Sequence, residues 1–375
     1  MRILIDGRFW GLENAGLGRY TINLVEELGK IDKKNEYLLL LRKKYFDKLS
    51  LPNNWTPLLA DFRHYSLIEQ IKLPGLISSY KPDLVHFLHF NVPYFYKGPF
   101  VVTIHDILMH KQKGLEATTL SAPPYLIKRL GYDTIFKKAV VNSQKVIVPS
   151  HVVKNEVVDY YQIDPGKVSV TYEGLDERVL QKEDGKKVMA KYQIDSSYFL
   201  YAGNAYPHKN LKRVIEAIIL LNKESDKKVL LVVATSRGIF EKRLKIETEK
   251  IGATDYVRLL GYVPDSDLGV LYENSLAFVF SSLSEGFGLP GLEALASGTV
   301  LIASDIPVFR EVYKESAFYF NPYDFSSIEK AMQDVIRMKD EQRKEAIDKG
   351  KEFAKRYSWS KMAEETLDVY KETVL

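Results

Sequence analysis

Two carboxylates flank a glycine-rich turn in the second half of the chain. The stretch runs Ser284-Glu285-Gly286-Phe287-Gly288-Leu289-Pro290-Gly291-Leu292-Glu293-Ala294. Glu285 precedes the turn, and Glu293 falls in the second turn of a helix that Pro290 would begin and Gly298 would end. Unpaired N–H groups in a helix's first turn bind anions, phosphate in particular. A ligand with hydroxyls at both ends and a diphosphate between them, such as a nucleotide-sugar, fits this order of groups.

The same stretch has a plainer interpretation that stays open at this point. A strand, a glycine loop and a helix are ordinary α/β construction, and glutamates near a helix start offset the macrodipole. Two features favour a ligand. The apolar run 276–280 predicts a buried strand ahead of the turn. Gly286 and Gly288 have no side chains, so a ligand could approach the backbone closely.

A second loop in the same half carries a lysine at a predicted helix start. Lys209 follows a strand over 198–201 and precedes a helix from Leu211. A cation there faces the positive end of the helix dipole, which is unfavourable unless an anion is bound. A solvated surface lysine is the alternative, but the shared location with Glu285 and Glu293 favours a phosphate ligand.

Two motifs in the first half of the chain also follow predicted strands. His105 ends the apolar strand 100–104, where it could donate or accept a proton near neutral pH, although a satisfied loop histidine is the alternative. Gly16-Leu17-Gly18-Arg19-Tyr20 follows the first strand and opens a helix. It is not the dinucleotide fingerprint, because Thr21 stands where that motif needs glycine.

Metal chemistry has little support in the sequence. The chain has no cysteine, which excludes disulfides, thiolate catalysis and cysteine–zinc sites. Asp265-Ser266-Asp267 precedes a predicted helix, so we expect a capping role. His86 and His89 would point to opposite faces of a strand. No metal site is therefore expected.

Composition suits a globular protein of two domains. The 375 residues are 46% hydrophobic and 27% charged, with a net charge of +4. This small excess of positive charge does not indicate nucleic acid as a partner, but it is compatible with an anionic substrate or membrane surface. There is no signal-peptide pattern and no membrane-spanning run, so we expect a cytoplasmic protein. The mixed apolar and basic segments 125–129 and 136–138 leave peripheral contact with the inner face of the membrane open, beside an ordinary amphipathic helix.

Short apolar runs alternate with amphipathic stretches, which predicts parallel sheets covered by helices. We expect strands at 2–5, 37–41, 84–87, 100–104, 145–148, 168–172, 198–201, 229–233, 257–260, 277–280 and 300–303. We expect helices at 19–29, 152–160, 211–221, 240–251, 267–274, 290–297 and 359–375. A polar, lysine-rich segment near 176–187 predicts a boundary between two Rossmann-like domains, 1–178 and 179–355. A ligand crevice is expected between them, at the carboxyl ends of the strands.

Taken in order, these motifs resemble the retaining glycosyltransferases of the GT-B fold, specifically glycosyltransferase family four. Glu285 to Glu293 matches the family's Glu-x7-Glu motif with its Gly-Phe-Gly-Leu-Pro core. The glycine loop 16–20, the strand end at His105 and the pair Lys209-Asn210 are supporting matches. The resemblance covers nearly the whole chain. It implies two Rossmann-like domains facing each other across a crevice, with the final helix, 356–375, packing back on the first domain.

The resemblance also implies roles for matched residues. As catalytic groups, Glu285 would hold donor-sugar hydroxyls near the reacting face, Lys209 would neutralise the leaving diphosphate, and His105 would lie beside the transferred sugar. Glu293 would bind the nucleotide ribose. Positions expected to meet sugar, phosphate, acceptor or base, largely through their backbone, are Gly16, Gly18, Tyr262, Val263, Gly286, Phe287, Gly288 and Leu289. The family is generally metal-independent, so neither a metal nor another cofactor is expected.

One position departs from the family pattern. Many members carry an arginine where this chain has Asn204. The phosphate charge would then be met by Lys209, by backbone donors and by Arg213, one helical turn beyond.

The sequence therefore predicts a retaining hexosyltransferase with a nucleotide-sugar donor and a glycan or lipid-linked acceptor. Its loops most resemble bacterial mannosyltransferases of surface-polysaccharide synthesis, which favours GDP-mannose as donor. A UDP-sugar glucosyl- or N-acetylglucosaminyltransferase is the alternative. A nicotinamide-dependent oxidoreductase and a catalytically silent scaffold are the alternatives from other classes. The oligomeric state is left open.

Overall fold

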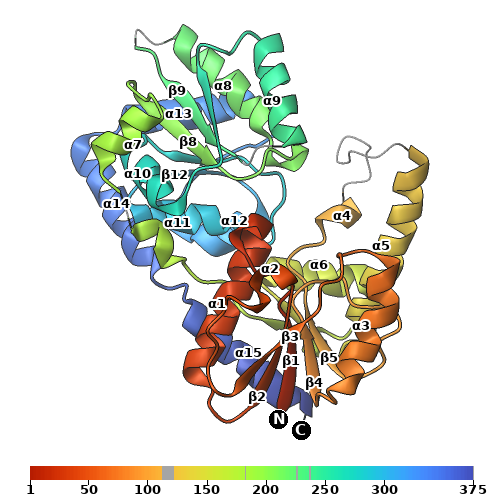
Figure 1. Ribbon diagram of the computed structural model, residues 1–375. Coiled ribbons are helices and arrows are strands. Elements are labelled where there is room, and N and C mark those ends of the chain that lie inside the picture. Colours follow the sequence, from red (N-terminus) through yellow and green to blue (C-terminus); the bar gives the residue numbers. More distant parts are fainter. Residues whose placement is uncertain (112–121, 182, 225–226, 236–237, 375) are drawn as a thin grey trace. The chain divides into compact units, whose positions relative to one another are not determined.

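The computed structural model describes residues 1–111, 122–181, 183–224, 227–235 and 238–374, with the side chains of 122–128 excepted. The chain forms two compact units (Figure 1). The first contains Met1–Gly174 and Ser358–Leu375, and the second contains Leu175–Tyr357. Each unit is a parallel sheet with helices packed on it, as the alternating sequence pattern predicts.

The first unit is built on a seven-stranded sheet in the order β3-β2-β1-β4-β5-β6-β7, with every pairing parallel. Its strands are β1 (Arg2–Asp6), β2 (Glu36–Leu41), β3 (Trp55–Leu59), β4 (Leu84–Phe87), β5 (Phe100–Thr103), β6 (Lys145–Val148) and β7 (Val168–Val170). Its helices are α1 (Ala15–Ile31), α2 (Lys43–Phe46), α3 (Leu67–Ser79), α4 (Leu108–Lys111), α5 (Ala122–Asn142), α6 (His151–Tyr161) and α15 (Trp359–Val374). The inner strands are buried on both faces, which explains their largely apolar character.

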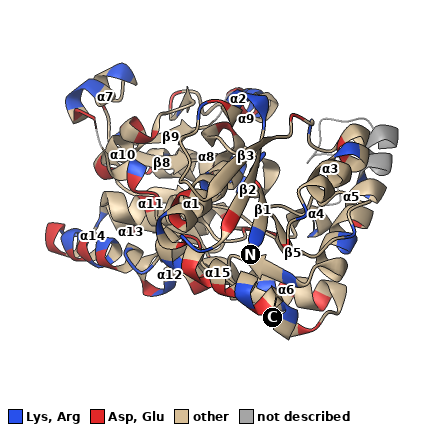
Figure 2. Cartoon of the chain, turned by 60° about the horizontal axis from the view of Figure 1, so that its bottom comes forward, with Lys and Arg blue, Asp and Glu red and all other residues tan. Residues whose placement is uncertain are grey.

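The second unit has a six-stranded parallel sheet in the order β10-β9-β8-β11-β12-β13. Its strands are β8 (Tyr198–Ala202), β9 (Leu230–Ala234), β10 (Val257–Gly261), β11 (Phe278–Phe280), β12 (Leu301–Ser304) and β13 (Phe318–Phe320). Its helices are α7 (Gly185–Lys191), α8 (Leu211–Lys223), α9 (Ile239–Lys250), α10 (Asp265–Asn274), α11 (Leu289–Ser297), α12 (Pro307–Tyr313), α13 (Phe325–Ile336) and α14 (Asp340–Ala354). The α14 helix carries acidic and basic side chains along its length (Figure 2).

The last helix packs within the first unit although it is the end of the chain. Helices α1 and α15 lie side by side (Figure 1). The ring of Tyr20 meets Trp359 edge-on at 6.3 Å. The hydroxyl of Tyr370 lies 2.6 Å from Nδ1 of His86 on β4. The amino- and carboxyl-terminal segments of the chain therefore share one core.

The predicted α/β class is confirmed, and every predicted strand is present to within two residues at its ends. Two edge strands were not predicted. β3 contains Pro57, which is tolerated at a sheet edge but obscures the strand pattern, and β13 is buried at only one of its three residues. The first helix was predicted from Arg19, but α1 begins at Ala15, so Gly16 and Gly18 lie in its first turn.

Candidate active site

Lys209 and Glu285 meet in the second unit. Lys209 ends the short 3-10 helix η5 (Pro207–Lys209) after β8, and Glu285 lies in the loop after β11. Their Nζ and Oε1 atoms are 2.5 Å apart, with side chains 17% and 15% exposed. β8 and β11 are neighbours in a parallel sheet, so their carboxyl ends, and the loops that follow, lie at the same edge.

Further hydrogen bonds join these two loops. The Ser281 hydroxyl donates to the carbonyl of Lys209 at 2.6 Å, and the Leu283 amide donates to the carbonyl of His208 at 2.8 Å. The Ser282 hydroxyl donates to Oε1 of Glu285 at 2.6 Å. Glu285 is thus held by a serine and a lysine at once, which fixes one carboxylate oxygen in place. Ser282 was not among the predicted site residues.

The glycine turn that leads into α11 is shaped by Tyr313. Gly288 is the N-cap of α11 and adopts φ 113°, a conformation that strongly favours glycine. The Tyr313 hydroxyl donates to the Gly288 carbonyl and occupies the space that a Cβ at Gly288 or Gly291 would need. The predicted helix is present, but it begins at Leu289, so Pro290 is its second residue. Phe287 is buried beside Tyr357.

Glu293 lies on α11 and is 4% exposed. Leu289, Pro290 and Gly291 make up the first three positions of the helix, so Glu293 is in its second turn, as the sequence predicts. A carboxylate so well buried keeps its charge only with polar partners. The second unit therefore brings Glu285, the glycine turn and Glu293 together on one loop and helix, with Lys209 attached through its ion pair.

His208 is a neutral neighbour of the pair. Burial lowers the pKa of His208 to about 4, with the positive charge of Lys209 acting in the same direction. Its ring stacks on Tyr206 at 5.8 Å. The imidazole is therefore uncharged near neutral pH and leaves Lys209 as the cation of this loop. Sequence reasoning missed His208, because nothing in the pattern marks it as buried.

Arg213 and Asn204 each form a hydrogen bond within the second unit. Arg213 donates from Nη1 to Oδ1 of Asn210 at 2.9 Å. Asn210 has φ 60° and donates to the carbonyl of Pro322 at 2.8 Å. The carbonyl of Asn204 accepts a hydrogen bond from the Tyr201 hydroxyl at 2.8 Å. Arg213 is thus held one residue from Lys212 and close to the loop that bears Lys209.

The segment after β10 contains Tyr262 and Val263. Tyr262 is 64% exposed, whereas Val263 is buried.

The capping role expected for Asp265 and Asp267 is wrong, because α10 begins at Asp265 with Pro264 as its N-cap. Asp267 instead accepts hydrogen bonds from Lys191 at 2.6 Å and from Tyr192 at 2.8 Å.

In the first unit, His105 is held from three sides. Its Nε2 lies 3.0 Å from the carbonyl of Leu88 and its Nδ1 lies 3.3 Å from Oε1 of Glu173. The ring of Tyr20 contacts it edge-on at 4.8 Å. Because Tyr20 lies on α1 two residues after Gly18, the glycine segment and His105 are linked through one side chain. A Cβ at Gly18 would overlap the Gly11 carbonyl, whereas Gly16 has open space around it.

The structure describes several other predicted features. Among the residues it covers, no three His, Asp or Glu side chains gather in a way that could hold a metal ion. His86 contacts Thr103 at 2.8 Å, and burial lowers its pKa to about 3.

The side chains of 125–128 lie outside the described residues. Phe136 is buried in the core, so its ring is not available for the membrane contact that the sequence left open. No helix in the described ranges is both long and apolar enough to cross a bilayer.

Comparison with known proteins gives consistent matches over both halves. Residues 15–179 match Glycosyltransferase Family 4, and residues 184–353 match the family of Glycosyl transferases group 1. The chain is 28% identical over 366 residues to the O-antigen chain mannosyltransferase RfbU of Salmonella typhimurium, covering 94% of each chain. It is 26% identical over 377 residues to the O-antigen chain mannosyltransferase B of Escherichia coli, covering 95% of this chain and 96% of the relative.

A solved structure agrees on the fold. The sucrose-phosphate synthase of Thermosynechococcus elongatus superposes with a TM-score of 0.74 at 16% identity, covering 99% of this chain and 98% of that chain. The two family matches together span both structural units, and the acidic motif, the glycine turn and the lysine loop all lie in the matched part of the second unit. The chain belongs to the GT-B glycosyltransferases, with a family 4 amino-terminal half and a group 1 carboxyl-terminal half.

Proposed function

We propose that this glycosyltransferase transfers mannose from GDP-mannose to a hydroxyl of a glycan or lipid-linked acceptor, with retention of configuration at the anomeric carbon. The choice of mannose is supported by two relatives that match nearly their whole length and are named O-antigen chain mannosyltransferases. In such a transfer, the bond from the anomeric carbon to the diphosphate breaks and GDP leaves with the electron pair. The acceptor oxygen forms the new bond on the same face, and its proton passes to an oxygen of the departing diphosphate.

The observation that carries the proposal is the ion pair between Lys209 and Glu285. In the structure, each group neutralises the other. A bound diphosphate would offer Lys209 a second anion, and the lysine would then stabilise charge on the leaving group. Glu285 would be released from the lysine and could accept hydrogen bonds from the sugar hydroxyls. The donor would thus exchange the partners of both residues.

The remaining residues keep the roles that the sequence motif implies, as part of the same proposal. Backbone groups of Gly286 to Leu289 would meet the sugar and phosphates, since a helix N-terminus favours anions. Glu293 would accept hydrogen bonds from the ribose hydroxyls. His105 is assigned to the transferred sugar, and its contact with the Leu88 carbonyl would fix the orientation of its ring.

A thermal-shift screen tests the donor assignment. A ligand that binds only the folded protein raises its melting temperature, by an amount that grows with the logarithm of the ratio of ligand concentration to dissociation constant. GDP and GDP-mannose should each raise the melting temperature more than UDP, ADP and their sugars at equal concentration. A larger shift with UDP-glucose or UDP-N-acetylglucosamine would replace the mannose assignment with the UDP-sugar alternative. No shift with any of these nucleotides would contradict the donor site itself.

A further inference from the structure

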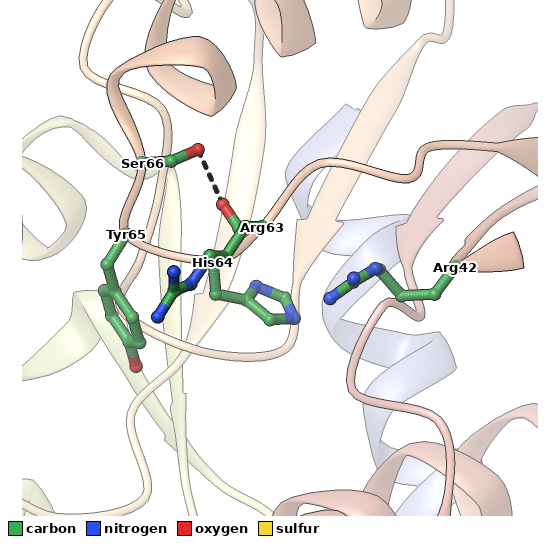
Figure 3. Close-up of a pocket in the computed structure, with 5 residues that line it drawn as sticks. All are labelled: Arg42, Arg63, His64, Tyr65 and Ser66. Carbon is green, nitrogen blue, oxygen red and sulfur yellow. Dashed lines mark hydrogen bonds between the residues drawn. The ribbon is translucent and has the colours of Figure 1, made fainter. Parts of the chain in front are cut away.

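A hollow in the first unit contains none of the site residues discussed so far. Its volume is about 510 Å³, and it is lined by Arg42, Arg63, His64, Tyr65 and Ser66 (Figure 3). Arg42 directly follows β2, and the other four lie between the end of β3 and the start of α3. The hollow is therefore at the carboxyl ends of parallel strands, the edge at which open α/β sheets bind ligands.

The lining is basic. Arg42 pairs with Asp61 at 2.8 Å. The guanidinium of Arg63, by contrast, has no carboxylate partner among the residues that the structure describes. In Figure 3, Arg42 extends toward the ring of His64, and Arg63 lies on the other side of that ring, beside Tyr65. Two guanidinium groups near one hollow provide planar donors that suit the oxygens of a phosphate or carboxylate.

The loop that carries these residues is held in a strained conformation. Tyr65 has φ 61°, which is uncommon for a residue with a side chain. Its amide donates to Oε2 of Glu69 at 2.7 Å. Glu69 is fully buried, forms an ion pair with Arg8 at 2.7 Å and accepts a hydrogen bond from Asn91 at 2.9 Å. A buried network beneath the loop thus imposes the strained residue, as is common at ligand sites.

Aromatic packing and a backbone contact also fix the position of His64. Its ring stacks on Phe9 with centroids 4.0 Å apart and planes 6° apart. Its Nε2 lies 3.4 Å from the Arg8 carbonyl. Tyr65, in contrast, is about half exposed. A tyrosine combines a large apolar ring with a polar hydroxyl, which suits a ligand such as a sugar that has both kinds of surface.

We propose that this hollow binds an anionic group of the acceptor, either a phosphate or a carboxylate, through Arg63 and Arg42, with an adjoining sugar ring against Tyr65. The inference rests on the proposed function in taking the substrate to be a glycan or lipid-linked acceptor. The same chemistry could come from a lipid phosphate or from an acidic sugar. An apolar helix face begins one residue beyond Ser66, where Leu67 is 82% exposed and Ile71 is 68% exposed. That face would contact the chain of a lipid but would not be needed by a free acidic sugar.

The test uses the full chain with saturating GDP, so that the donor site is filled and cannot bind the probe. Titration calorimetry measures the affinity of the proposed anion site for inorganic pyrophosphate and for glucuronate. Flotation with phosphatidylcholine vesicles, with and without phosphatidic acid, measures binding to a lipid phosphate. The variants are Arg63→Ala, Arg42→Ala and Ile71→Ser. Lys371→Ala removes an exposed charge from α15 of the same unit and is the control.

The proposal predicts that Arg63→Ala weakens the binding of at least one anionic probe by tenfold or more, while Lys371→Ala leaves the binding of all three probes unchanged. If Ile71→Ser also reduces binding to acidic vesicles, the anion is that of a lipid; weakened glucuronate binding without that effect indicates an acidic sugar. Unchanged affinity for every probe in both arginine variants would overturn the proposal. GDP affinity should stay the same in Arg63→Ala. A wild-type protein that fails to bind GDP would instead count against the proposed donor.

Discussion

Lys209 and Glu285 are 76 positions apart in the sequence, yet Nζ of the lysine lies 2.5 Å from Oε1 of the glutamate. The contact arises because β8 and β11 are adjacent strands of one parallel sheet. Each side chain is mostly shielded from water, and a hydrogen bond from Ser282 fixes the shared carboxylate oxygen. A preorganised pair of opposite charges beside a helix N-terminus is suited to a ligand that carries both hydroxyls and phosphate.

Glu285→Gln should lower turnover more than donor binding. The amide keeps the shape of the side chain but loses the charge that would strengthen its hydrogen bonds to the sugar in the transition state. We expect kcat to fall on the order of 10²-fold, with a change of threefold or less in KM for the donor. Steady-state kinetics of nucleotide release measure both quantities. Glu345→Gln, on the exposed surface of α14, is the matched control. Equal small losses in both variants would remove Glu285 from the reaction.

Lys209→Ala should weaken binding of the nucleoside diphosphate but not of the nucleoside. A charge-assisted hydrogen bond contributes about 1.5–3 kcal/mol, which corresponds to about 10- to 100-fold in affinity. The dissociation constant of GDP should rise by that factor while that of guanosine stays nearly constant. Calorimetry with the two ligands gives the ratio directly. Lys212→Ala removes an exposed lysine of α8 three residues away and should change neither constant. A GDP-to-guanosine ratio equal to that of the wild type would contradict the phosphate role.

Glu293→Ala should weaken donor binding through loss of the ribose contact. Truncating a hydrogen-bonded carboxylate costs about 1.5–3 kcal/mol, so the donor dissociation constant should rise about tenfold or more. The 2′-deoxy form of the nucleotide provides the decisive comparison. The wild type should prefer the ribonucleotide, and the variant should bind both forms with similar affinity. A variant that keeps the wild-type preference would place the ribose contact elsewhere.

Stability should depend on pH through His86. Burial lowers the folded-state pKa of His86 to about 3, whereas the unfolded value is near 6.5. Below pH 6.5 the unfolded chain therefore binds a proton that the folded chain does not. This group lowers the free energy of unfolding by about 1.4 kcal/mol for each pH unit between roughly 6.5 and 3. Urea unfolding between pH 7 and 5 should show a shallower pH dependence in His86→Gln. The same slope in both proteins would contradict the buried neutral assignment.

Gly288→Ala should destabilise the second unit. The left-handed backbone of Gly288 and the Tyr313 hydroxyl beside it leave no room for a methyl group. We expect a loss of about 1–3 kcal/mol in the free energy of unfolding, measured by urea denaturation. Gly75→Ala, in the interior of α3 with open space around it, should instead stabilise by about 0.5–1 kcal/mol. A neutral effect of Gly288→Ala would show that the turn can rearrange.

Much of the fold could be predicted from the sequence because both faces of these parallel strands are buried. The mainly apolar runs of β4 and β6, in which only His86 and Lys145 are polar, predict both strands with the bounds that the structure shows. β3 escaped prediction because Pro57 interrupts its pattern, and α14 escaped because charged residues surround most of it.

The site was predictable where its chemistry is local and not where it depends on strand order. Glu285, the glycine turn and Glu293 follow one another in the chain, so their arrangement can be inferred from spacing. The contact between Lys209 and Glu285 depends on which strands pair, which spacing does not reveal. The pKa of His208 and the hydroxyl of Tyr313 beneath the turn likewise depend on tertiary packing.

The central claim is mannosyl transfer from GDP-mannose, and acceptor-dependent release of GDP tests it most directly. The wild-type protein should release GDP from GDP-mannose in the presence of a mannose-terminated glycan and yield a product whose new anomeric centre has the configuration of the donor, as read by nuclear magnetic resonance. Glu285→Gln should release GDP on the order of 10²-fold more slowly. Turnover of a UDP-sugar in preference to GDP-mannose, or a product of inverted configuration, would contradict the account.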